Sequence, residues 1–289
     1  MQIRRLGWAG LEIEAAGAVA VVDLLEDLGA SAKLLGEPRT ALPPATPGAA
    51  SLALLTHLHA DHADVPALSR ALAPDGVVLR PAPMDGPPLE RGGTMEAEEA
   101  LEAHGLRTQV VAPWESVTVG PFTATALPAV DGFGDAQVSW VLEADGTRVL
   151  HAGDTLMHGW WWRAVMRTGP IDVAFLPVNG AVVSLPHRQP ASRLPVDMGP
   201  REAVEAARAV RARLAVPMHY GTIHHPPVYT ELEGAAETFV ALAEEHGVPA
   251  RIVEPGAPVP LPEPAGDQPS IRAASSSAAR ARAGSESAA

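Results

Sequence analysis

Four side chains that commonly bind metals lie within six residues of one another early in this chain. They are His57, His59, Asp61 and His62, and the apolar segment before them, residues 51–55, predicts a short strand. Side chains two residues apart point to the same side of extended backbone, so the first two imidazoles can reach one metal ion. The other two follow as the chain turns, and they can reach a second ion. A solvated loop with incidental histidines is the alternative, but few such loops hold four ligands in six positions.

Three single residues near strand ends could complete such a site. Asp154 follows a predicted strand at residues 148–151, and the two oxygens of its carboxylate can be shared between two cations. His219 follows a predicted strand at residues 214–217, and Asp23 ends an early strand. Each is a weak signal alone, because Asp and Gly after a strand usually form a turn. Together, and in this order, they support a metal site.

The elements that must position these residues are short strands, many separated by glycines, and a few helices. Loops are expected at residues 29–50 and 81–95. The other strands are predicted at residues 3–8, 11–14, 19–23, 109–111, 116–119, 122–127, 138–143 and 173–176, and the helices at residues 65–72, 96–104, 201–213 and 230–246. One domain is expected over residues 1–256. Residues 257–289 are rich in Ala, Ser, Pro and Arg, with few large apolar side chains, so we expect a disordered tail there.

Composition narrows the class of protein. The chain has 289 residues, of which 47% are hydrophobic, which is enough for one large domain. The formal net charge is -13, and an acidic surface disfavours nucleic acid as a partner. Cysteine is absent, which excludes disulfides, thiolate-bound zinc and a thiol nucleophile. No signal peptide or membrane-spanning apolar run is evident, so we expect a cytoplasmic protein with no membrane partner.

The motif at residues 57–62 resembles the His-x-His-x-Asp-His signature of the metallo-β-lactamase superfamily. Asp23, Asp154 and His219 fall where that family has its early Asp, its bridging Asp and its last His. The similarity covers about residues 3–254. It implies an α+β fold in the form of a four-layer αββα sandwich. Within the superfamily, the segments around the last two residues look most like the branch that contains ascorbate-phosphate lactonase.

The resemblance implies a metal-dependent hydrolase with two divalent cations, Zn²⁺ in first place and Mn²⁺ as the alternative. Such a pair lowers the pKa of a shared water, so that it can attack a lactone, ester or phosphoester bond of a small molecule. Asp61 is the implied proton acceptor, and Asp23 is implied to hold one ligand histidine in a single tautomer. The implied ligands are His57, His59, Asp131 and Asp154 for the first cation, and Asp61, His62, Asp154 and His219 for the second.

One position departs from the family pattern and keeps other functions open. Asp131 stands where relatives usually have a third histidine for the first cation. Its carboxylate could bind metal and favour harder ions such as Mn²⁺, or it could point away. The second reading allows a catalytically impaired binding protein. A phosphodiesterase or nuclease on the same fold is the other alternative, although the acidic balance counts against it. Trp8, where relatives often have His, is interpreted as packing near the rim of the site.

Four further residues are candidates for the site, each with a structural alternative. His151 lies three residues before Asp154, and we expect either a catalytic or a purely structural role. Asn179, Tyr220 and His224 are expected to contact the substrate, although turn and loop roles are the alternatives. The expected partner is a small-molecule substrate, and a homo-oligomer is left open.

Overall fold

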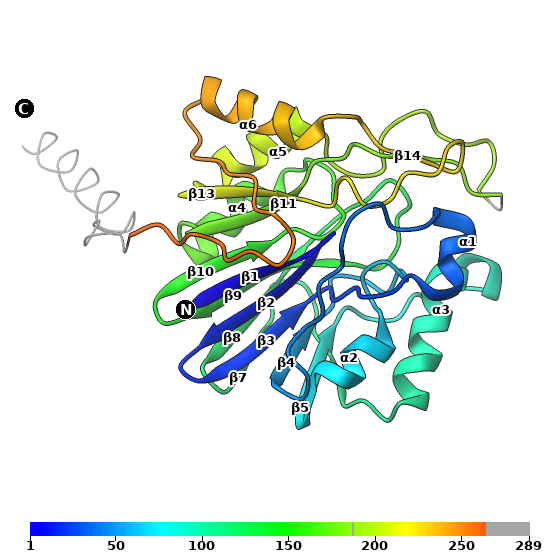
Figure 1. Cartoon of the computed structure of the whole chain (residues 1–289), viewed down its shortest axis with the longest axis horizontal. Helices are drawn as coiled ribbons and strands as arrows, with labels where there is room; N and C mark the ends of the chain where they lie inside the picture. The colour runs from blue at the N-terminus through cyan, green and yellow to red at the C-terminus, as the bar shows by residue number, and fades with distance from the viewer. Residues whose placement is uncertain (187, 264–289) are drawn as a thin grey trace, which may run out of the picture.

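Two six-stranded sheets pack face to face, and helices cover the outer face of each sheet (Figure 1). The computed structural model describes residues 1–186 and 188–263. The first sheet has, in spatial order, β1 (Gln2–Gly7), β2 (Gly10–Ala15), β3 (Ala18–Val22), β4 (Ala50–Leu54), β5 (Leu72–Arg80) and β6 (Thr108–Val110). The second has, in spatial order, β13 (Leu214–Met218), β11 (Val173–Pro177), β10 (Thr147–His151), β9 (Val138–Ala144), β8 (Phe122–Pro128) and β7 (Ser116–Val119).

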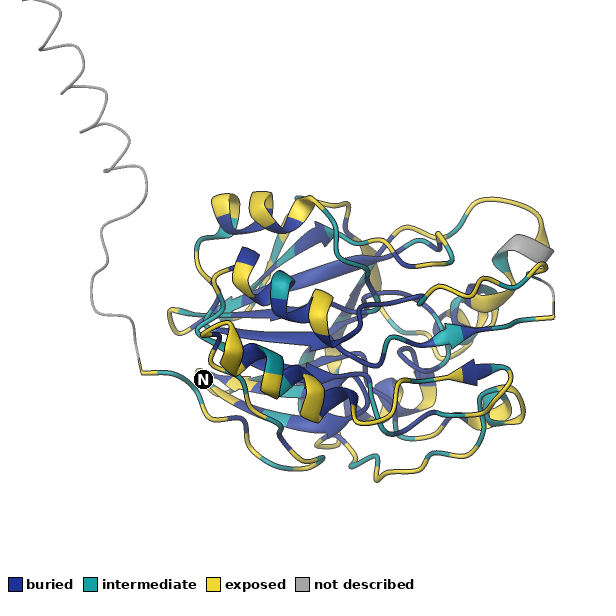
Figure 2. Ribbon diagram, turned by 90° about the horizontal axis from the view of Figure 1, so that it is seen from above, coloured by how far each residue is buried: buried dark blue, intermediate teal, exposed yellow. Residues whose placement is uncertain are grey.

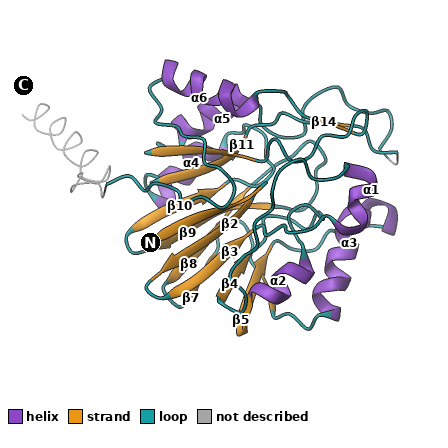
Figure 3. Cartoon of the chain, viewed as in Figure 1, coloured by secondary structure: helices purple, strands orange, loops and turns teal. Residues whose placement is uncertain are grey.

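The helices fall into two groups, one on each side of the paired sheets (Figure 3). The group beside the first sheet is α2 (Val65–Ala71) and α3 (Pro88–Ala103), with the short α1 (Ala32–Leu35) nearby. The group beside the second sheet is α4 (Trp160–Thr168), α5 (Pro200–Ala209) and α6 (Ala235–Glu245). A small two-stranded sheet joins β12 (Val182–Val183) to β14 (Tyr229–Thr230). The predicted four-layer αββα sandwich is therefore confirmed.

Alternation along the strands separates two buried cores. Leu52 and Leu54 of β4 belong to the core shared with the second sheet. Ala53 and Leu55 belong to the core shared with α2 and α3. This follows from the period of two in a strand, which sends successive side chains to opposite faces. In Figure 2 most of the strand residues are accordingly buried, whereas the helices are exposed on their outer sides.

The parallel strand pairs bring the chemically important loops to one edge of the sandwich. In the first sheet β3 runs parallel to β4, and in the second sheet β10, β11 and β13 run parallel to one another. The segments after β3, β4, β10 and β13 hold Asp23, His57, Asp154 and His219. Each of these strands therefore ends in a loop that contributes to the same site.

Several element boundaries differ from the sequence prediction. The expected loop at residues 81–95 is partly helical, because α3 begins at Pro88, and proline is tolerated in the first turn of a helix. The last helix begins at Ala235 rather than at residue 230, because Tyr229 and Thr230 pair with β12 instead. Strand β5 and helix α4 were not predicted at all. No helix in the described ranges is both long and apolar enough to cross a membrane.

Ordered contacts with β1 extend beyond the domain boundary predicted at residue 256. The backbone N–H of Arg5 donates to the carbonyl of Ala257 at 3.1 Å, and that of Val259 donates to Ile3 at 2.8 Å. The side chain of Val259 is buried against the core, and this burial of apolar surface stabilises the position of the segment. The rest of the predicted tail, residues 264–289, lies outside the described residues, so its disorder stays a prediction.

Candidate metal centre

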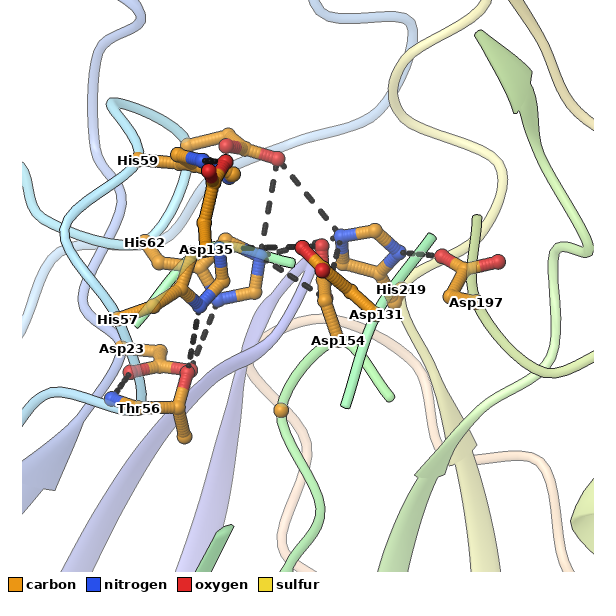
Figure 4. Close-up of polar contacts among 12 residues, drawn as sticks. Asp23, Thr56, His57, His59, His62, Asp131, Asp135, Asp154, Asp197 and His219 are labelled. Carbon is orange, nitrogen blue, oxygen red and sulfur yellow. Dashed lines mark hydrogen bonds and ion pairs between the residues drawn. The ribbon is translucent and has the colours of Figure 1, made fainter. Parts of the chain in front are cut away.

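Two overlapping groups of possible metal ligands lie at this edge of the sandwich (Figure 4). Ligand atoms of Asp61, His62, Asp154 and His219 all lie within 4.8 Å of one another. Those of His57, His59 and Asp61 form a second group by the same measure. The sequence prediction named all six residues, and the structure brings them together from three loops.

A buried network on Asp23 assigns the tautomers of two histidines. Oδ2 of Asp23 lies 2.8 Å from Nδ1 of His62, so this nitrogen carries the proton and donates. The hydroxyl of Thr56 donates to the same Oδ2 at 2.6 Å and lies 3.0 Å from Nδ1 of His57. Because the hydroxyl proton of Thr56 is donated to Asp23, the hydroxyl oxygen accepts a hydrogen bond from Nδ1 of His57. In the neutral form of each ring, Nε2 is therefore the nitrogen that has the lone pair.

The Nε2 atoms of His62 and His219 face each other at 3.1 Å. Nδ1 of His219 lies 3.1 Å from Oδ2 of Asp197, an ion-pair contact that favours a proton on Nδ1 although its geometry is not that of a hydrogen bond. Two imidazole lone pairs at this distance repel unless a proton or a metal ion lies between them. Nε2 of His57 is also buried without a hydrogen-bond partner in the described structure. Three Nε2 lone pairs beside Asp61 and Asp154 are a donor set that fits zinc.

His59 has the opposite tautomer from the other three histidines. Its Nε2 lies 2.8 Å from Oδ2 of Asp135, so this nitrogen donates and Nδ1 is left as the possible ligand. The ring is perpendicular to that of His57, at an interplanar angle of 85°. Two histidines two residues apart thus offer different nitrogens to one place.

Carboxylates control the charge of the site. Burial alone would lower the pKa of His62, but Asp154, Asp61 and Asp23 outweigh it and raise this pKa to about 10. The pKa of His219 is also raised against the effect of burial, chiefly by Asp154. In the described ranges, the ion pairs of Asp61 and Asp154 are with histidines only, not with lysine or arginine. The site therefore stabilises positive charge where the ligands converge.

Trp8 contacts two of the ligand residues directly. Its indole N–H donates to Oδ2 of Asp61 at 3.1 Å, and its ring centroid lies 3.9 Å from that of His219. The sequence analysis expected Trp8 near the rim of the site. Its side chain is fully buried, so Trp8 lies inside the site instead. Trp8, Asp23 and His219 all have positive φ, at 43°, 42° and 58°. Such backbone strain in residues other than glycine often accompanies functional sites.

Asp131 does not belong to either ligand group. Its Oδ1 accepts the backbone N–H groups of Phe133 and Gly134 at 2.9 and 2.6 Å, which closes a turn. Burial, as the main cause, raises its pKa. The ligand role expected for Asp131 could be filled only by its other oxygen, and it stays a prediction.

His151 lies beside the site, with Nδ1 3.8 Å from Oδ2 of Asp23, but both His151 and Asn179 have polar partners inside the protein. Nε2 of His151 lies 2.7 Å from the carbonyl of Ala9, and its Nδ1 accepts the N–H of Gly153 at 3.3 Å. Both ring nitrogens therefore have backbone partners, which does not support the expected catalytic role. Asn179 is fully buried and its amide donates to the hydroxyl of Tyr229 at 2.9 Å, so a direct substrate contact has no support either.

Tyr220 and His224 lie in the loop that follows His219. The hydroxyl of Tyr220 lies 3.4 Å from Nη1 of Arg5, whose guanidinium is also 4.9 Å from the ring centroid. This contact explains the position of Tyr220 by packing. His224 is partly buried. The expected substrate contacts of both residues stay predictions.

Two carboxylates that support the ligands were missed from the sequence. Asp135 holds His59, and Asp197 holds His219. Asp135 could have been noticed, because it lies four residues after Asp131 in a loop already linked to the site. Asp197 gave no signal, since it lies in a long irregular segment before α5, 22 residues before the histidine it contacts.

A two-sheet sandwich with histidine and aspartate ligands at one edge defines the metallo-β-lactamase fold class of metal-dependent hydrolases. This chain belongs to the beta-lactamase superfamily domain family, whose model matches residues 20–220. A UPF0173 metal-dependent hydrolase of Opitutus terrae is 30% identical over 216 residues, which cover 71% of this chain and 79% of the relative.

Solved structures share the architecture at lower identity. Igni18, a metallo hydrolase of Ignicoccus hospitalis, superposes with a TM-score of 0.62 at 19% identity, covering 89% of this chain and 97% of that chain. An isothiocyanate hydrolase from Delia radicum gut bacteria superposes with a TM-score of 0.65 at 20% identity, covering 90% and 98%. These likenesses show the shared fold.

Proposed function

We propose that this enzyme hydrolyses a lactone, ester or phosphoester bond of a small molecule with two divalent cations, of which Zn²⁺ is preferred. The observation that carries the proposal is the 3.1 Å approach of the Nε2 atoms of His62 and His219. Asp23 and Asp197 contact the opposite nitrogens of these rings, so both lone pairs face one point. Bound there, the cations would lower the pKa of water and polarise the substrate oxygen.

The protein's own side chains have separable tasks in this proposal. His57, His59, Asp61, His62, Asp154 and His219 would hold the cations. Trp8 donates to Oδ2 of Asp61 and so orients this carboxylate, which we propose as the proton acceptor. The Thr56 hydroxyl donates to Asp23 and is therefore not a free nucleophile. Cysteine is also absent from the chain, and the nucleophile we propose is a water activated by the cations.

Access to the site favours a small substrate group. Among the six ligands, only His59, Asp154 and Asp61 have appreciable side-chain exposure, at 20%, 14% and 11%. The reacting bond must therefore approach from the side of these three residues. The resemblance to the ascorbate-phosphate lactonase branch, together with the net charge of -13, favours a metabolite over a nucleic acid.

The first test is the metal content of protein purified without chelator or nickel, measured by elemental mass spectrometry. Close to two divalent ions per chain are expected, with hydrolysis of at least one substrate in a panel of lactones, esters, phosphomonoesters and phosphodiesters. Asp154→Asn should lose most of both, whereas Asp145→Asn, at an exposed hairpin, should lose neither. No bound metal after incubation with Zn²⁺ or Mn²⁺ would contradict the proposal. Metal without turnover would favour the binding-protein alternative.

A further inference from the structure

A chain of two hydrogen bonds links the candidate ligand His59 to an arginine in another loop. Oδ2 of Asp135 lies 2.8 Å from Nε2 of His59, and Oδ1 of the same carboxylate accepts from Nη2 of Arg188 at 2.8 Å. The carboxylate is almost fully buried, with 5% of its side chain exposed, while Arg188 is 32% exposed. Both oxygens of Asp135 are thus committed to charge-assisted contacts.

The same arginine also holds the loop that carries Asp135. Its Nη1 donates to the carbonyl of Phe133 at 2.8 Å, and its guanidinium lies 4.9 Å from the centroid of the Phe133 ring. From the other end of the loop, Oδ1 of Asp131 accepts from the N–H groups of Phe133 and Gly134. Residues 131–135 are therefore held at both ends, and Asp135 cannot move without breaking these contacts.

Asp135 gives His59 a different tautomer from the other three ligand histidines. His57, His62 and His219 have contacts at Nδ1 and present Nε2, whereas His59 is bound at Nε2 and presents Nδ1. His59 is also the most exposed of these rings. Gly93 of α3 lies against it, since a Cβ there would be 3.3 Å from its Cδ2. Packing limits the ring on one side, but only a hydrogen-bond acceptor selects which nitrogen faces inward.

We propose that Asp135, secured by Arg188, is the positioning residue for His59, and that Asp131 serves as the turn cap of this loop. The inference rests on the proposed metal-dependent function. A carboxylate behind an imidazole fixes its tautomer and orientation and strengthens it as a metal ligand. The loop thereby supports the cation held by His57 and His59 without supplying a third histidine. The Asp61, His62, Asp154 and His219 group does not depend on it.

The test combines imidazole NMR with metal titration of the full chain. In assigned ¹⁵N-histidine spectra of the Zn²⁺-loaded protein, His59 should be the Nε2–H tautomer, whereas the ligand histidines His57, His62 and His219 should be Nδ1–H tautomers. Asp135→Ala should remove the Nε2–H signal and weaken the weaker of two Zn²⁺ binding steps by about 10- to 100-fold. The tighter step should stay unchanged. Arg188→Met, which keeps the carboxylate, should give a smaller loss in the same step.

A matched control is Asp172→Ala. Asp172 likewise accepts from an arginine, Arg213, at 2.9 Å and is partly buried, but it lies away from the ligands. It should lower the unfolding temperature without changing either Zn²⁺ step. The inference is overturned if Asp135→Ala keeps the Nε2–H signal and both wild-type affinities.

Failure of the proposed function can be told apart from failure of this inference. If the wild type binds no metal, the proposed function fails, but the Nε2–H of His59 can still be observed in the metal-free protein. Its loss in Asp135→Ala would then uphold the positioning role, and its persistence would refute it. Should Asp135→Ala fail to fold, Arg188→Met decides by the same signal and the same Zn²⁺ step.

Discussion

Nε2 of His62 lies 3.1 Å from Nε2 of His219, although both rings have a carboxylate near their opposite nitrogen. The pKa values of both histidines are raised, that of His62 to about 10, because Asp154 and its neighbours outweigh the effect of burial. In the metal-free protein at neutral pH, protons therefore supply the positive charge that this site stabilises.

Metal binding should consequently release protons. At pH 7.5 the proton between the two Nε2 atoms must leave before both lone pairs can bind metal, so release of about one proton per chain is expected. Calorimetric titration with Zn²⁺ in two buffers of different ionisation enthalpy measures this number. His57 adds none, because burial and its histidine neighbours lower its pKa to about 3. Release of no protons would mean that the cation does not displace them from these rings.

The stability of the metal-free protein should fall at alkaline pH. The pKa of His62 rises from 6.5 in the unfolded chain to about 10 in the folded one, so folding favours its protonated form. This contribution is fully present below about pH 6.5 and is lost as the pH rises through about 10. The unfolding temperature should drop on the order of 5 °C across that window. With saturating Zn²⁺, whose ligand is the neutral imidazole, the drop should be much smaller. An equal drop with and without metal would count against this explanation.

Gly153→Ala should destabilise the enzyme more than a glycine substitution elsewhere. Gly153 has a φ of 65°, and a Cβ there would lie 2.7 Å from Cβ of Thr56, which supports Asp23 and His57. Gly247 has a φ of 66° with nothing within 4 Å, so Gly247→Ala carries the backbone strain without the clash. We expect about 1 kcal/mol for the control and about 1–3 kcal/mol more for Gly153→Ala. Urea unfolding measures both, and equal losses would show that the close approach relaxes without cost.

Thr56→Val should separate the contribution of the Thr56 hydroxyl from that of the side chain's volume. The change removes the donor to Asp23 and the acceptor for His57 but keeps the volume and the backbone bond from the Thr56 N–H to Asp23. Two buried polar atoms lose a partner, so a loss of about 1–3 kcal/mol is expected in urea unfolding of the metal-free protein. Zn²⁺ affinity should fall with it. Thr56→Ser, which restores the hydroxyl, should recover most of both, and a failure to recover would implicate the methyl group instead.

Trp8→Phe should weaken metal binding and remove an optical signal of it. Phenylalanine can keep the stacking on His219 but cannot donate to Asp61, so an affinity loss of about 10-fold is expected. Wild-type tryptophan emission should change on Zn²⁺ binding, because Trp8 touches two ligand residues, and this change should disappear in the variant. Trp162→Phe, at a side chain that is 53% exposed, should retain it. Persistence of the full change in Trp8→Phe would assign the signal to another indole.

The candidate ligands could be read from the sequence because their spacing is local. His57, His59, Asp61 and His62 lie within one short segment, and the strand before it is a continuous apolar run. Asp154 and His219 each follow a strand of the same kind. A polar side chain at a strand end is held in place by a rigid sheet. Such residues can therefore be recognised as candidates without knowledge of tertiary contacts.

The supporting residues could not be found that way, because their partners are distant in the chain. Asp197 contacts a ring 22 residues away, and Asp135 meets His59 across the two sheets, 76 residues apart. Neither lies in a pattern of its own. Trp8 was placed in the region of the site from its position, but its hydrogen bond to Asp61, 53 residues away, could not be predicted from local sequence.

By itself, the sequence determined most strands and helices through their periodicity and the ligand cluster of His57, His59, Asp61 and His62 through its local spacing. The αββα architecture and the roles of Asp154 and His219 were implied by the resemblance to the metallo-β-lactamase superfamily. Only the tertiary structure decided the tautomer of each ligand histidine, the turn-capping contacts of Asp131 and the buried position of His151. The physical reason is that a tautomer depends on which acceptor lies opposite the second ring nitrogen. That acceptor is brought there by the packing of two sheets and not by its neighbours in the chain.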